Sequence, residues 1–242
     1  MTVRTTVPVA TRRAVVRFSR QHTLAQFQRC IRDIYGLPDD RLFSLADLLV
    51  NQERFTMRAL KGIRKGDTRK LTTNLLIAFS WTAAVCNRLH VNLADVVWRR
   101  FPRVCSYCGH GPCVCKKEKP TERARISRRP SRKPARLAEF QEMFRGIYPP
   151  ETRTLADAGV HLAEETGEVG EAAHWFFGEH KQALFEKLEN ELADWVSCMF
   201  GVANSAGMDV AAELEQMYEE NCHACHRAPC VCSFSTVGKF PS

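Results

Sequence analysis

Two pairs of acidic residues, each with a spacing of three, are the clearest chemical feature of this chain. Glu165 and Glu168 form the first pair, and Glu191 and Asp194 form the second. On a helix, a spacing of three puts both members of a pair on one face. If two such helices are antiparallel neighbours, the four carboxylates converge, and like charges raise each other's pKa. A hard divalent cation such as Mg²⁺, which takes oxygen ligands and is often completed by substrate phosphates, removes that cost.

The alternative for any helical acid is a solvated face. Several other acids of the same segment fit that interpretation: Glu164, Glu171, Glu179, Glu186 and Glu189. The paired acids differ because apolar residues flank them, as in Leu162-Ala163 and Trp195-Val196. Their helix faces are therefore partly directed to the core. This setting favours a metal site for the four paired acids.

A di-iron site is a second alternative. Glu171 and His174 form an ExxH element, and so do Glu220 and His223. A di-iron bundle needs two such elements and two further glutamates from other helices in matching register. Glu171 shares its segment with the paired acids, and His223 lies among cysteines beyond the last expected helix. The pattern therefore fits a di-iron centre poorly.

The paired acids belong to the second of two copies of one domain. Residues 24–28 (LAQFQ) return as residues 137–141 (LAEFQ) at an offset of 113, and later matches have an offset of 117. A long period used twice indicates a duplicated domain. At the four acid positions the first copy has Gln52, Phe55, Asn74 and Ile77. Only the second copy keeps the acids.

Both copies have the pattern of four helices. The expected helices lie near residues 23–35, 42–65, 68–89 and 93–102, and near residues 136–147, 155–177, 180–206 and 209–221. Asn92 and Asp209 are suitable N-caps for the last helix of each copy. Short connections and one apolar side per helix predict an all-α fold of two four-helix bundles. A core helix is expected over residues 75–86, and no apolar run has the length of a membrane span.

The chain divides into seven expected segments. They are a basic N-terminal arm (1–20), a degenerate helical domain (21–104), a four-cysteine cluster (105–115), a basic linker (116–136), a second helical domain (137–221), a second cluster (222–232) and a tail (233–242). The arginine-rich start also has the composition of an organelle transit peptide. Without an apolar signal segment, a cytoplasmic protein is expected.

Three segments of the second copy resemble the MazG-like all-α nucleoside triphosphate pyrophosphatases. These are residues 162–169 (LAEETGEV), 191–194 (ELAD) and 203–209 (ANSAGMD). The family signature is ExxE followed, after a gap of helix-to-helix length, by ExxD. The resemblance covers about residues 137–221, with a degenerate copy over 24–104. It implies that the four acids bind Mg²⁺, that NTP and water give NMP and pyrophosphate, and that Glu165 or Glu168 orients the attacking water.

Charge divides the two copies. Residues 1–115 hold 19 Lys and Arg against 7 Asp and Glu, whereas residues 137–242 hold 6 against 18. Opposite net charges favour pairing of the two copies with each other as a pseudo-dimer. Family members often have lysines near the asparagine that ends the last helix, and residues 213–221 have none. We therefore expect Arg58 and Arg100 of the first copy, together with Tyr218 and Asn221, to contact the nucleotide.

The pattern Cys-x2-Cys-x4-Cys-x-Cys follows the last helix of each copy. The first cluster is Cys105, Cys108, Cys113 and Cys115, and the second is Cys222, Cys225, Cys230 and Cys232. Such tight groups predict a structural Zn²⁺ bound by four thiolates in each cluster. Disulfides and an iron–sulfur centre stay open as alternatives.

Three functions are consistent with these features. The leading one is an Mg²⁺-dependent pyrophosphohydrolase acting on nucleoside triphosphates. A non-catalytic zinc protein that binds nucleic acid through the basic linker and the cysteine clusters is the alternative, and a slow nucleotide sensor is the third. Weak nonspecific nucleic-acid binding and further homo-oligomerisation remain open.

Overall fold

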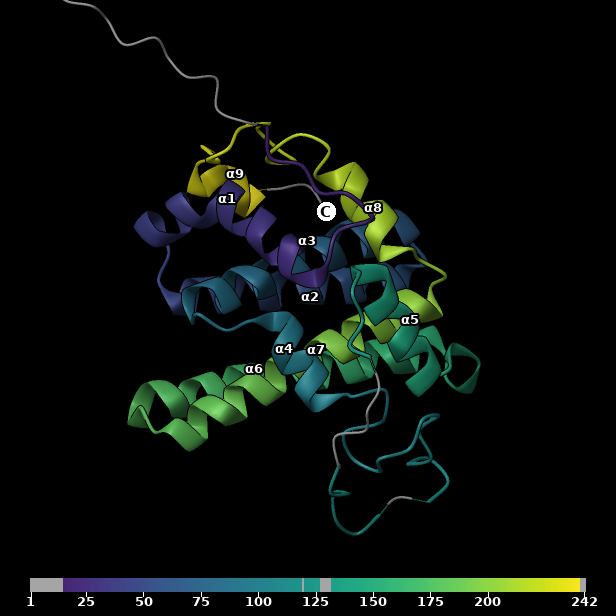
Figure 1. Cartoon of the computed structure of the whole chain (residues 1–242). Coiled ribbons are helices and arrows are strands. Elements are labelled where there is room, and N and C mark those ends of the chain that lie inside the picture. Colours follow the sequence, from purple (N-terminus) through teal and green to yellow (C-terminus); the bar gives the residue numbers. More distant parts are fainter. Residues whose placement is uncertain (1–14, 119, 127–131, 240–242) are drawn as a thin grey trace, which may run out of the picture.

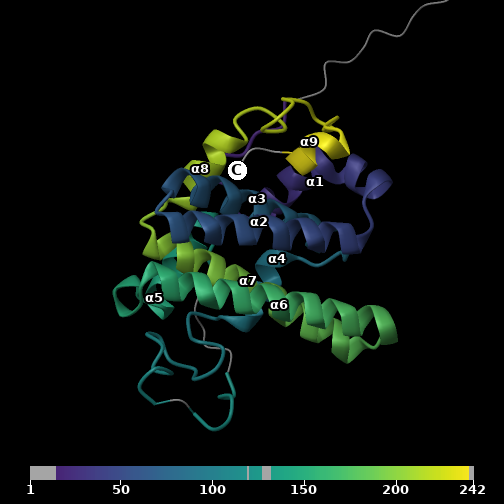
Figure 2. The same ribbon diagram turned by 180° about the vertical axis from the view of Figure 1, so that it is seen from behind.

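A computed structural model of the chain describes residues 15–118, 120–126 and 132–239. These residues form helices and connecting segments without a strand, which confirms the all-α prediction (Figures 1 and 2). We call residues 24–100 the first repeat and residues 137–217 the second repeat. The first repeat contains α1 (Leu24–Leu42), α2 (Leu45–Lys65), α3 (Thr68–Arg88) and α4 (Leu93–Arg100). The second contains α5 (Leu137–Ile147), the 3₁₀ turn η1 (Pro150–Thr152), α6 (Leu155–Glu179), α7 (Gln182–Ser205) and α8 (Val210–Met217), and α9 (Phe234–Lys239) follows it.

Local sequence accounts for most helix starts. Thr23, Ser44 and Thr154 each accept from a backbone N–H of the first turn in a capping box. Asn92 and Asp209 cap α4 and α8 through their side chains, as expected. The eight expected helices therefore begin within three residues of their expected positions.

The expected end of the first helix near Tyr35 is wrong. α1 continues through Pro38 to Leu42. A proline inside a helix leaves the carbonyl four residues earlier without its usual partner. Here that carbonyl, of Ile34, accepts the backbone N–H of Cys230 at 2.7 Å. A contact with the other end of the chain thus stabilises a helix that the local sequence would end. The helix α9 in the tail was also not expected, and α8 ends at Met217 and not at Asn221.

The two repeats share one internal hydrogen-bond pattern. The Gln28 side chain donates to Asn87 Oδ1 (3.1 Å) and to the Val91 carbonyl (2.7 Å). In the second repeat, Gln141 donates to Asn204 Oδ1 (3.0 Å) and to the Met208 carbonyl (2.6 Å). These residues are related by the offsets of 113 and 117 found in the sequence. The duplication is therefore preserved in the packing of each repeat.

Equivalent elements also join the repeats. α2 contacts α6, and α4 contacts α7 just as its counterpart α8 contacts α3. Aromatic rings repeat the relation, with Tyr35 against Tyr218 (6.3 Å between centroids) and Phe101 against Tyr148 (6.4 Å). Buried apolar residues of both repeats form a single core cluster. Neither repeat therefore buries its apolar surface alone.

Each cysteine cluster contacts the repeat to which it does not belong. The first cluster follows α4, and Cys113 donates its N–H to the carbonyl of Ile147, the last residue of α5, at 2.8 Å. The second cluster follows α8, and Cys230 donates to Ile34 in α1. Residues 113 and 230, like 34 and 147, are equivalent positions. The clusters thus connect the two repeats twice.

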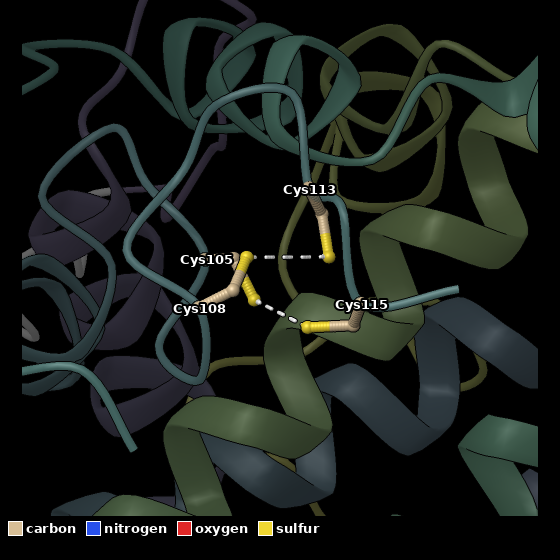
Figure 3. A group of neighbouring side chains, drawn as sticks. All are labelled: Cys105, Cys108, Cys113 and Cys115. Carbon is tan, nitrogen blue, oxygen red and sulfur yellow. Dashed lines mark hydrogen bonds between the residues drawn. The ribbon is translucent and has the colours of Figure 1, made fainter. Parts of the chain in front are cut away.

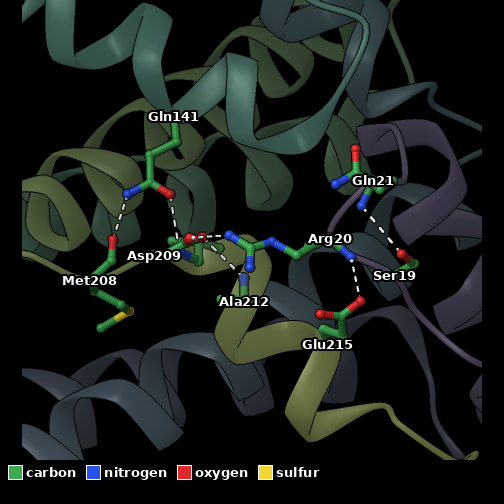
Figure 4. A network of polar contacts seen from close by, with 9 residues as sticks. Ser19, Arg20, Gln21, Gln141, Met208, Asp209, Ala212 and Glu215 are labelled. Carbon is green, nitrogen blue, oxygen red and sulfur yellow. Dashed lines mark hydrogen bonds and ion pairs between the residues drawn. The ribbon is translucent and has the colours of Figure 1, made fainter.

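The segment before α1 packs on α8 of the second repeat. Arg20 pairs with Asp209 (3.3 Å), and its backbone N–H donates to Glu215 (3.1 Å), as Figure 4 shows. Phe18 is buried, and its N–H donates to the carbonyl of Tyr218. Residues 15–20 of the expected basic arm therefore belong to the folded body. Residues 1–14 lie outside the described residues.

The basic linker leaves the helices as an extended loop, which projects at the bottom of Figure 1. Its described residues contain no helix, as expected for a linker. Lys133 pairs with Asp95, and Arg123 lies over the ring of Tyr107 at 5.6 Å. Across the described parts of the chain, none of the helices combines the length and the apolar character that crossing a membrane requires.

Candidate active site

Helices α6 and α7 bring three of the four paired acids together. The two helices pack along each other as a hairpin, joined at His180-Lys181. One carboxylate oxygen each of Glu165, Glu168 and Glu191 lies within 4.8 Å of the other two. Carboxylate oxygens at this separation suit a hard divalent cation such as Mg²⁺. The convergence expected from the spacing of three is therefore present for these three residues.

Two oxygens of this acid group lack a protein partner. Glu191 is only 9% exposed, and Glu165 is half-buried, whereas Glu168 is exposed. Glu165 Oε2 and Glu191 Oε2 are buried and accept no hydrogen bond. Buried carboxylate oxygens without partners are costly unless a cation binds them. The donor set thus fits a divalent metal by its chemistry as well as by its spacing.

Asp194, the fourth acid, is held by an arginine of the first repeat. Arg100, the last residue of α4, donates from Nε to Asp194 Oδ1 (3.0 Å) and from Nη2 to Oδ2 (2.6 Å). The two side chains are only 15% and 11% exposed. Next to this pair, Arg99 binds Glu189 at 2.7 Å. The first repeat therefore places a cation directly beside the acid group of the second.

Burial and mutual repulsion change the proton affinity of the site. Burial, followed by the charges of Asp194, Glu168 and Glu191, raises the pKa of Glu165 to about 8. Burial and the same kind of repulsion raise the pKa of Glu191. Burial lowers the pKa of Arg100, but its bond to Asp194 and the nearby acids together raise it above its ordinary value. A cation is therefore needed before all the acids are readily ionised.

The raised pKa of Glu165 predicts how stability depends on pH without added Mg²⁺. The folded state binds a proton up to about pH 8, whereas an unfolded glutamate releases it near pH 4.5. The stabilisation of the folded state by the protonated Glu165 is complete below about pH 4.5 and is lost as pH rises to about 8. We expect urea midpoints to fall between pH 5.5 and pH 8.5 in the wild type, and much less in Glu165→Gln. Equal slopes in both proteins would contradict this assignment.

The first repeat has no comparable acid group among its described residues. The expected register between α2 and α6 is wrong, because their N-caps Ser44 and Thr154 are equivalent and give an offset of 110. The bonds from Thr56 Oγ1 to the Gln52 carbonyl and from Thr166 Oγ1 to the Leu162 carbonyl repeat this offset. Phe55 and Arg58 therefore stand at the places of Glu165 and Glu168, and Asn74 and Ile77 stand at those of Glu191 and Asp194. Among the described residues, the only carboxylate group that could hold a metal is formed by Glu165, Glu168 and Glu191 of the second repeat.

Other residues expected to contact a nucleotide lie elsewhere. Tyr218 is fully buried, and its hydroxyl lies 2.7 Å from Ser80 Oγ. Asn221 binds the backbone of Val16 through Oδ1 (3.0 Å) and through its own N–H (2.7 Å). Both side chains thus serve packing between chain segments, and the structure does not support nucleotide contacts by them. Arg58 lies over the ring of Phe55 in its own repeat, 5.2 Å from the centroid.

The four sulfur atoms of each cysteine cluster lie close together. Figure 3 shows those of the first cluster pointing toward one another. In the first cluster, Cys105 and Cys115 are 3.9 Å apart at Sγ, as are Cys108 and Cys113. The corresponding pairs of the second cluster are 3.9 and 3.8 Å apart. Tetrahedral Zn–S bonds of about 2.3 Å place neighbouring sulfurs about 3.8 Å apart. Both clusters therefore fit a Zn²⁺ ion, and their sulfurs are too far apart for disulfides.

Backbone groups prepare the clusters for a metal. The N–H of Tyr107 donates to Cys105 Sγ, and the N–H of Ala224, its counterpart, donates to Cys222 Sγ, both at 3.4 Å. Such bonds stabilise a thiolate, which is the form that binds metal. The repetition of the same contact in both clusters indicates one shared design for two sites.

The ExxH elements do not assemble. Glu171 and His174 are both exposed on α6. In the described part of the chain, three groups of residues could hold a metal: the two cysteine clusters and the three glutamates. Neither histidine of the ExxH elements belongs to any of them. The di-iron alternative therefore has no site here.

Comparisons with protein-family models, with curated proteins and with solved structures gave no match. The function must therefore be argued from the geometry of the chain itself. The acid group with its adjoining arginine, and the two four-thiolate clusters, are the features with clear chemistry.

One further residue near the site has no signal in any motif. Arg153, directly after η1, lies against α7, and its Nε and Nη2 atoms are buried without a partner. Comparison of the repeats could have drawn attention to it, because the first copy has Phe43 at the same place before the N-cap. A lone arginine in a connection between helices is otherwise indistinguishable from a solvated one.

Proposed function

We propose that the protein is an Mg²⁺-dependent nucleoside triphosphate pyrophosphohydrolase, converting an NTP and water to an NMP and pyrophosphate. Its active site lies in the second repeat. The observation that carries the proposal is the convergence of Glu165, Glu168 and Glu191 within 4.8 Å, with two buried oxygens that lack partners. Such a group is costly to a protein unless it binds cations.

The chemistry follows from the donor set. Bound Mg²⁺ would neutralise phosphate charge and acidify a water for attack at the α-phosphorus. Glu165 and Glu191, the less exposed acids, would hold the cation. Glu168 is exposed, so it can accept the proton of an incoming water. The apolar neighbours Val169, Leu192 and Trp195 are buried and hold both helices in register.

Arg100 makes the site a composite of both repeats. It reaches the acid group from α4, and its charge acts on Glu165 and Glu191 as well as on Asp194. We propose that it stabilises negative charge on the substrate when metal binds the acids. The two repeats would then form a tandem MazG-like pseudo-dimer, in which the copy without acids supplies the cation. Their opposite net charges support this arrangement.

Replacing Arg100 tests the composite site. Arg100→Ala leaves Asp194 buried without its partner, so we expect a loss of about 3 kcal/mol in unfolding free energy. We also expect kcat/KM to fall about 10²-fold, because a positioned donor to the substrate charge is lost. Arg99→Ala is the matched control, since Arg99 is an adjacent, more exposed partner of Glu189. Equal kcat/KM values for Arg100→Ala and wild type would refute the role.

The decisive assay for the activity is release of pyrophosphate. Purified protein would be incubated with Mg²⁺ and each common NTP and dNTP, and pyrophosphate would be measured beside a Glu168→Gln variant. Release that depends on Mg²⁺ and on Glu168 is the expected result. Pyrophosphate release by the wild type no greater than that by the variant would refute the proposal.

A binding function without catalysis is the second candidate. Its support is the projecting basic linker, in which Lys117, Arg123 and Arg125 are exposed. Such a segment would bind nucleic acid through phosphates, and binding would weaken steeply with salt. A gel shift that is lost at moderate salt would indicate only this nonspecific contact. It would not explain the acid group.

A further inference from the structure

A second cation lies in the second repeat, on the same side of α7 as the acids. The Arg153 guanidinium rests on the backbone of Gly201, where an added Cβ would lie 2.2 Å from Nη2 and 3.0 Å from Cζ. The ring of Tyr148 lies 5.8 Å from its Cζ. The absence of a side chain at Gly201 therefore creates the space that the guanidinium occupies.

Two N–H donors of the Arg153 guanidinium have no hydrogen-bond partner. Its Nε and Nη2 atoms are buried and make no hydrogen bond. These are the same two atoms with which Arg100 grips both oxygens of Asp194. Together they form one edge of the guanidinium, with two parallel N–H donors. Leaving such donors unpaired costs free energy, and a ligand with two adjacent acceptors would recover it.

Arg153 contacts the same face of α7 that carries Glu191 and Asp194. Glu191, Asp194, Cys198 and Gly201 follow one another at intervals of three, four and three, so they share one face of α7. With a rise of 1.5 Å per residue, Gly201 lies about 10 Å along the helix from Asp194. The charges of Glu165, Arg153 and Asp194 all act on the Cys198 thiol between them, whose pKa burial raises. One ligand lying along α7 could thus reach both the acids and Arg153.

The corner that carries Arg153 is fixed by the first cysteine cluster. Lys116, which follows Cys115, donates from Nζ to the carbonyl of Thr152 at 2.9 Å. Cys113 donates to Ile147 at the end of α5. Both contacts hold the connection from α5 to α6, in which Arg153 lies. The guanidinium is therefore presented by an anchored turn.

We infer that Arg153 recognises the base of the nucleotide whose phosphates are held at the acids. The inference rests on the proposed function for the placement of the phosphates. Two parallel donors match two adjacent acceptors, as on the N7 and O6 edge of guanine or the O2 and N3 edge of cytosine. Adenine and uracil have no edge with two adjacent acceptors, so they match one N–H only. The site therefore selects guanine or cytosine nucleotides.

The first repeat supports this inference by contrast. At the place of Arg153, directly before the N-cap of the corresponding helix, it has Phe43, which is buried. At the place of Gly201 it has Ala84, whose side chain would fill the guanidinium space. The repeat without the acid group thus also lacks both the arginine and the glycine on which it rests. Arginine, glycine and acids occur together in one repeat.

The test measures base selectivity apart from turnover. Binding of GTP, CTP, ATP, UTP and inorganic tripolyphosphate would be measured by calorimetry with Mg²⁺, in a Glu168→Gln background that prevents turnover. We expect GTP or CTP to bind more tightly than ATP and UTP. Arg153→Lys, which keeps the charge but loses the paired donors, should weaken the preferred nucleotide about 5- to 150-fold. Tripolyphosphate binding should stay unchanged.

Gly201→Ala provides a second, independent variant. Alanine favours the helix, so the fold is expected to be retained, but its Cβ would displace the flexible end of Arg153. Selectivity should be lost as in Arg153→Lys, whereas Arg145→Ala, an exposed arginine on α5, should keep it. Equal weakening of all four nucleotides and of tripolyphosphate would make Arg153 a phosphate contact and overturn the inference. So would unchanged selectivity in both variants.

The same measurements separate the inference from the proposed function. Base-selective binding that depends on Arg153, without release of pyrophosphate by the wild type, would leave the inference standing and remove the activity. Release of pyrophosphate at equal rates from all bases would do the opposite. Absence of nucleotide binding would overturn both.

Discussion

Glu191→Gln is expected to lower pyrophosphate release by about 10³-fold or more, because an anionic oxygen is removed from the centre of the acid group. The substitution keeps the shape of the side chain. Burial and neighbouring acids raise the pKa of Glu191, so its charge is unfavourable to the fold when no cation is bound. The stability of the variant without Mg²⁺ should therefore equal or exceed that of the wild type. A large loss of activity combined with unchanged or higher stability is the signature of a carboxylate kept for function.

Glu186→Gln is the matched control for this prediction. Glu186 lies on the same helix, is exposed and accepts from Gln182 at 3.2 Å. Its replacement should leave both turnover and stability nearly unchanged, since surface substitutions usually have small effects. If Glu186→Gln and Glu191→Gln behaved alike, the acid group would have no special role. Calorimetric titration with Mg²⁺ would show whether the loss of activity reflects loss of the metal.

Loss of either zinc site is the second large effect that we expect. Cys108→Ser and Cys225→Ser should each reduce bound zinc from two ions to one per chain. Each should also cost several kcal/mol of unfolding free energy, because the free energy of metal binding at such clusters contributes to folding. The clusters also join the two repeats through the backbone contacts of Cys113 and Cys230. Each variant should therefore loosen the packing between repeats. Elemental analysis and urea unfolding would measure the two effects.

The two clusters should differ in their effect on nucleotide binding. The first cluster anchors the turn that carries Arg153, through Cys113 and Lys116. The second contacts α1 of the first repeat, whereas the three-glutamate group lies on α6 and α7. Cys108→Ser should thus weaken nucleotide binding more than Cys225→Ser does. Cys86→Ser, a buried thiol within α3, should leave the zinc content at two. Zinc content unaffected by both cluster variants would contradict these assignments.

The division of charge between the repeats has a structural meaning. Two pairs, Arg99 with Glu189 and Arg100 with Asp194, join α4 of the basic repeat to α7 of the acidic one. The second pair is largely shielded from water, so it is costly to break. The copy that lost its acids has therefore become a partner of the copy that kept them.

The helices were predictable because their signals are local. Apolar residues recur with helical spacing, and N-caps such as Asn92 and Asp209 can be recognised from residues no more than four positions away. Two parts were missed: α9, and the part of α1 beyond Pro38. The Ile34 carbonyl that Pro38 leaves free accepts from Cys230, far along the chain. The spacing of three within each acid pair likewise follows from helix geometry alone. The cysteine spacing sufficed to predict two four-thiolate groups.

The sequence by itself determined the helices, the duplication, the acid pairs and the cysteine clusters, because each depends on residues close together or on direct comparison of the copies. Tertiary structure decided which side chains meet. Arg100 binds Asp194, 94 residues away, whereas the side chains of Tyr218 and Asn221 pack against other segments of the chain. It also left Arg153 with unpaired donors on the bare backbone of Gly201. Such contacts depend on how helices pack, and residue spacing within one helix carries no information about its neighbour.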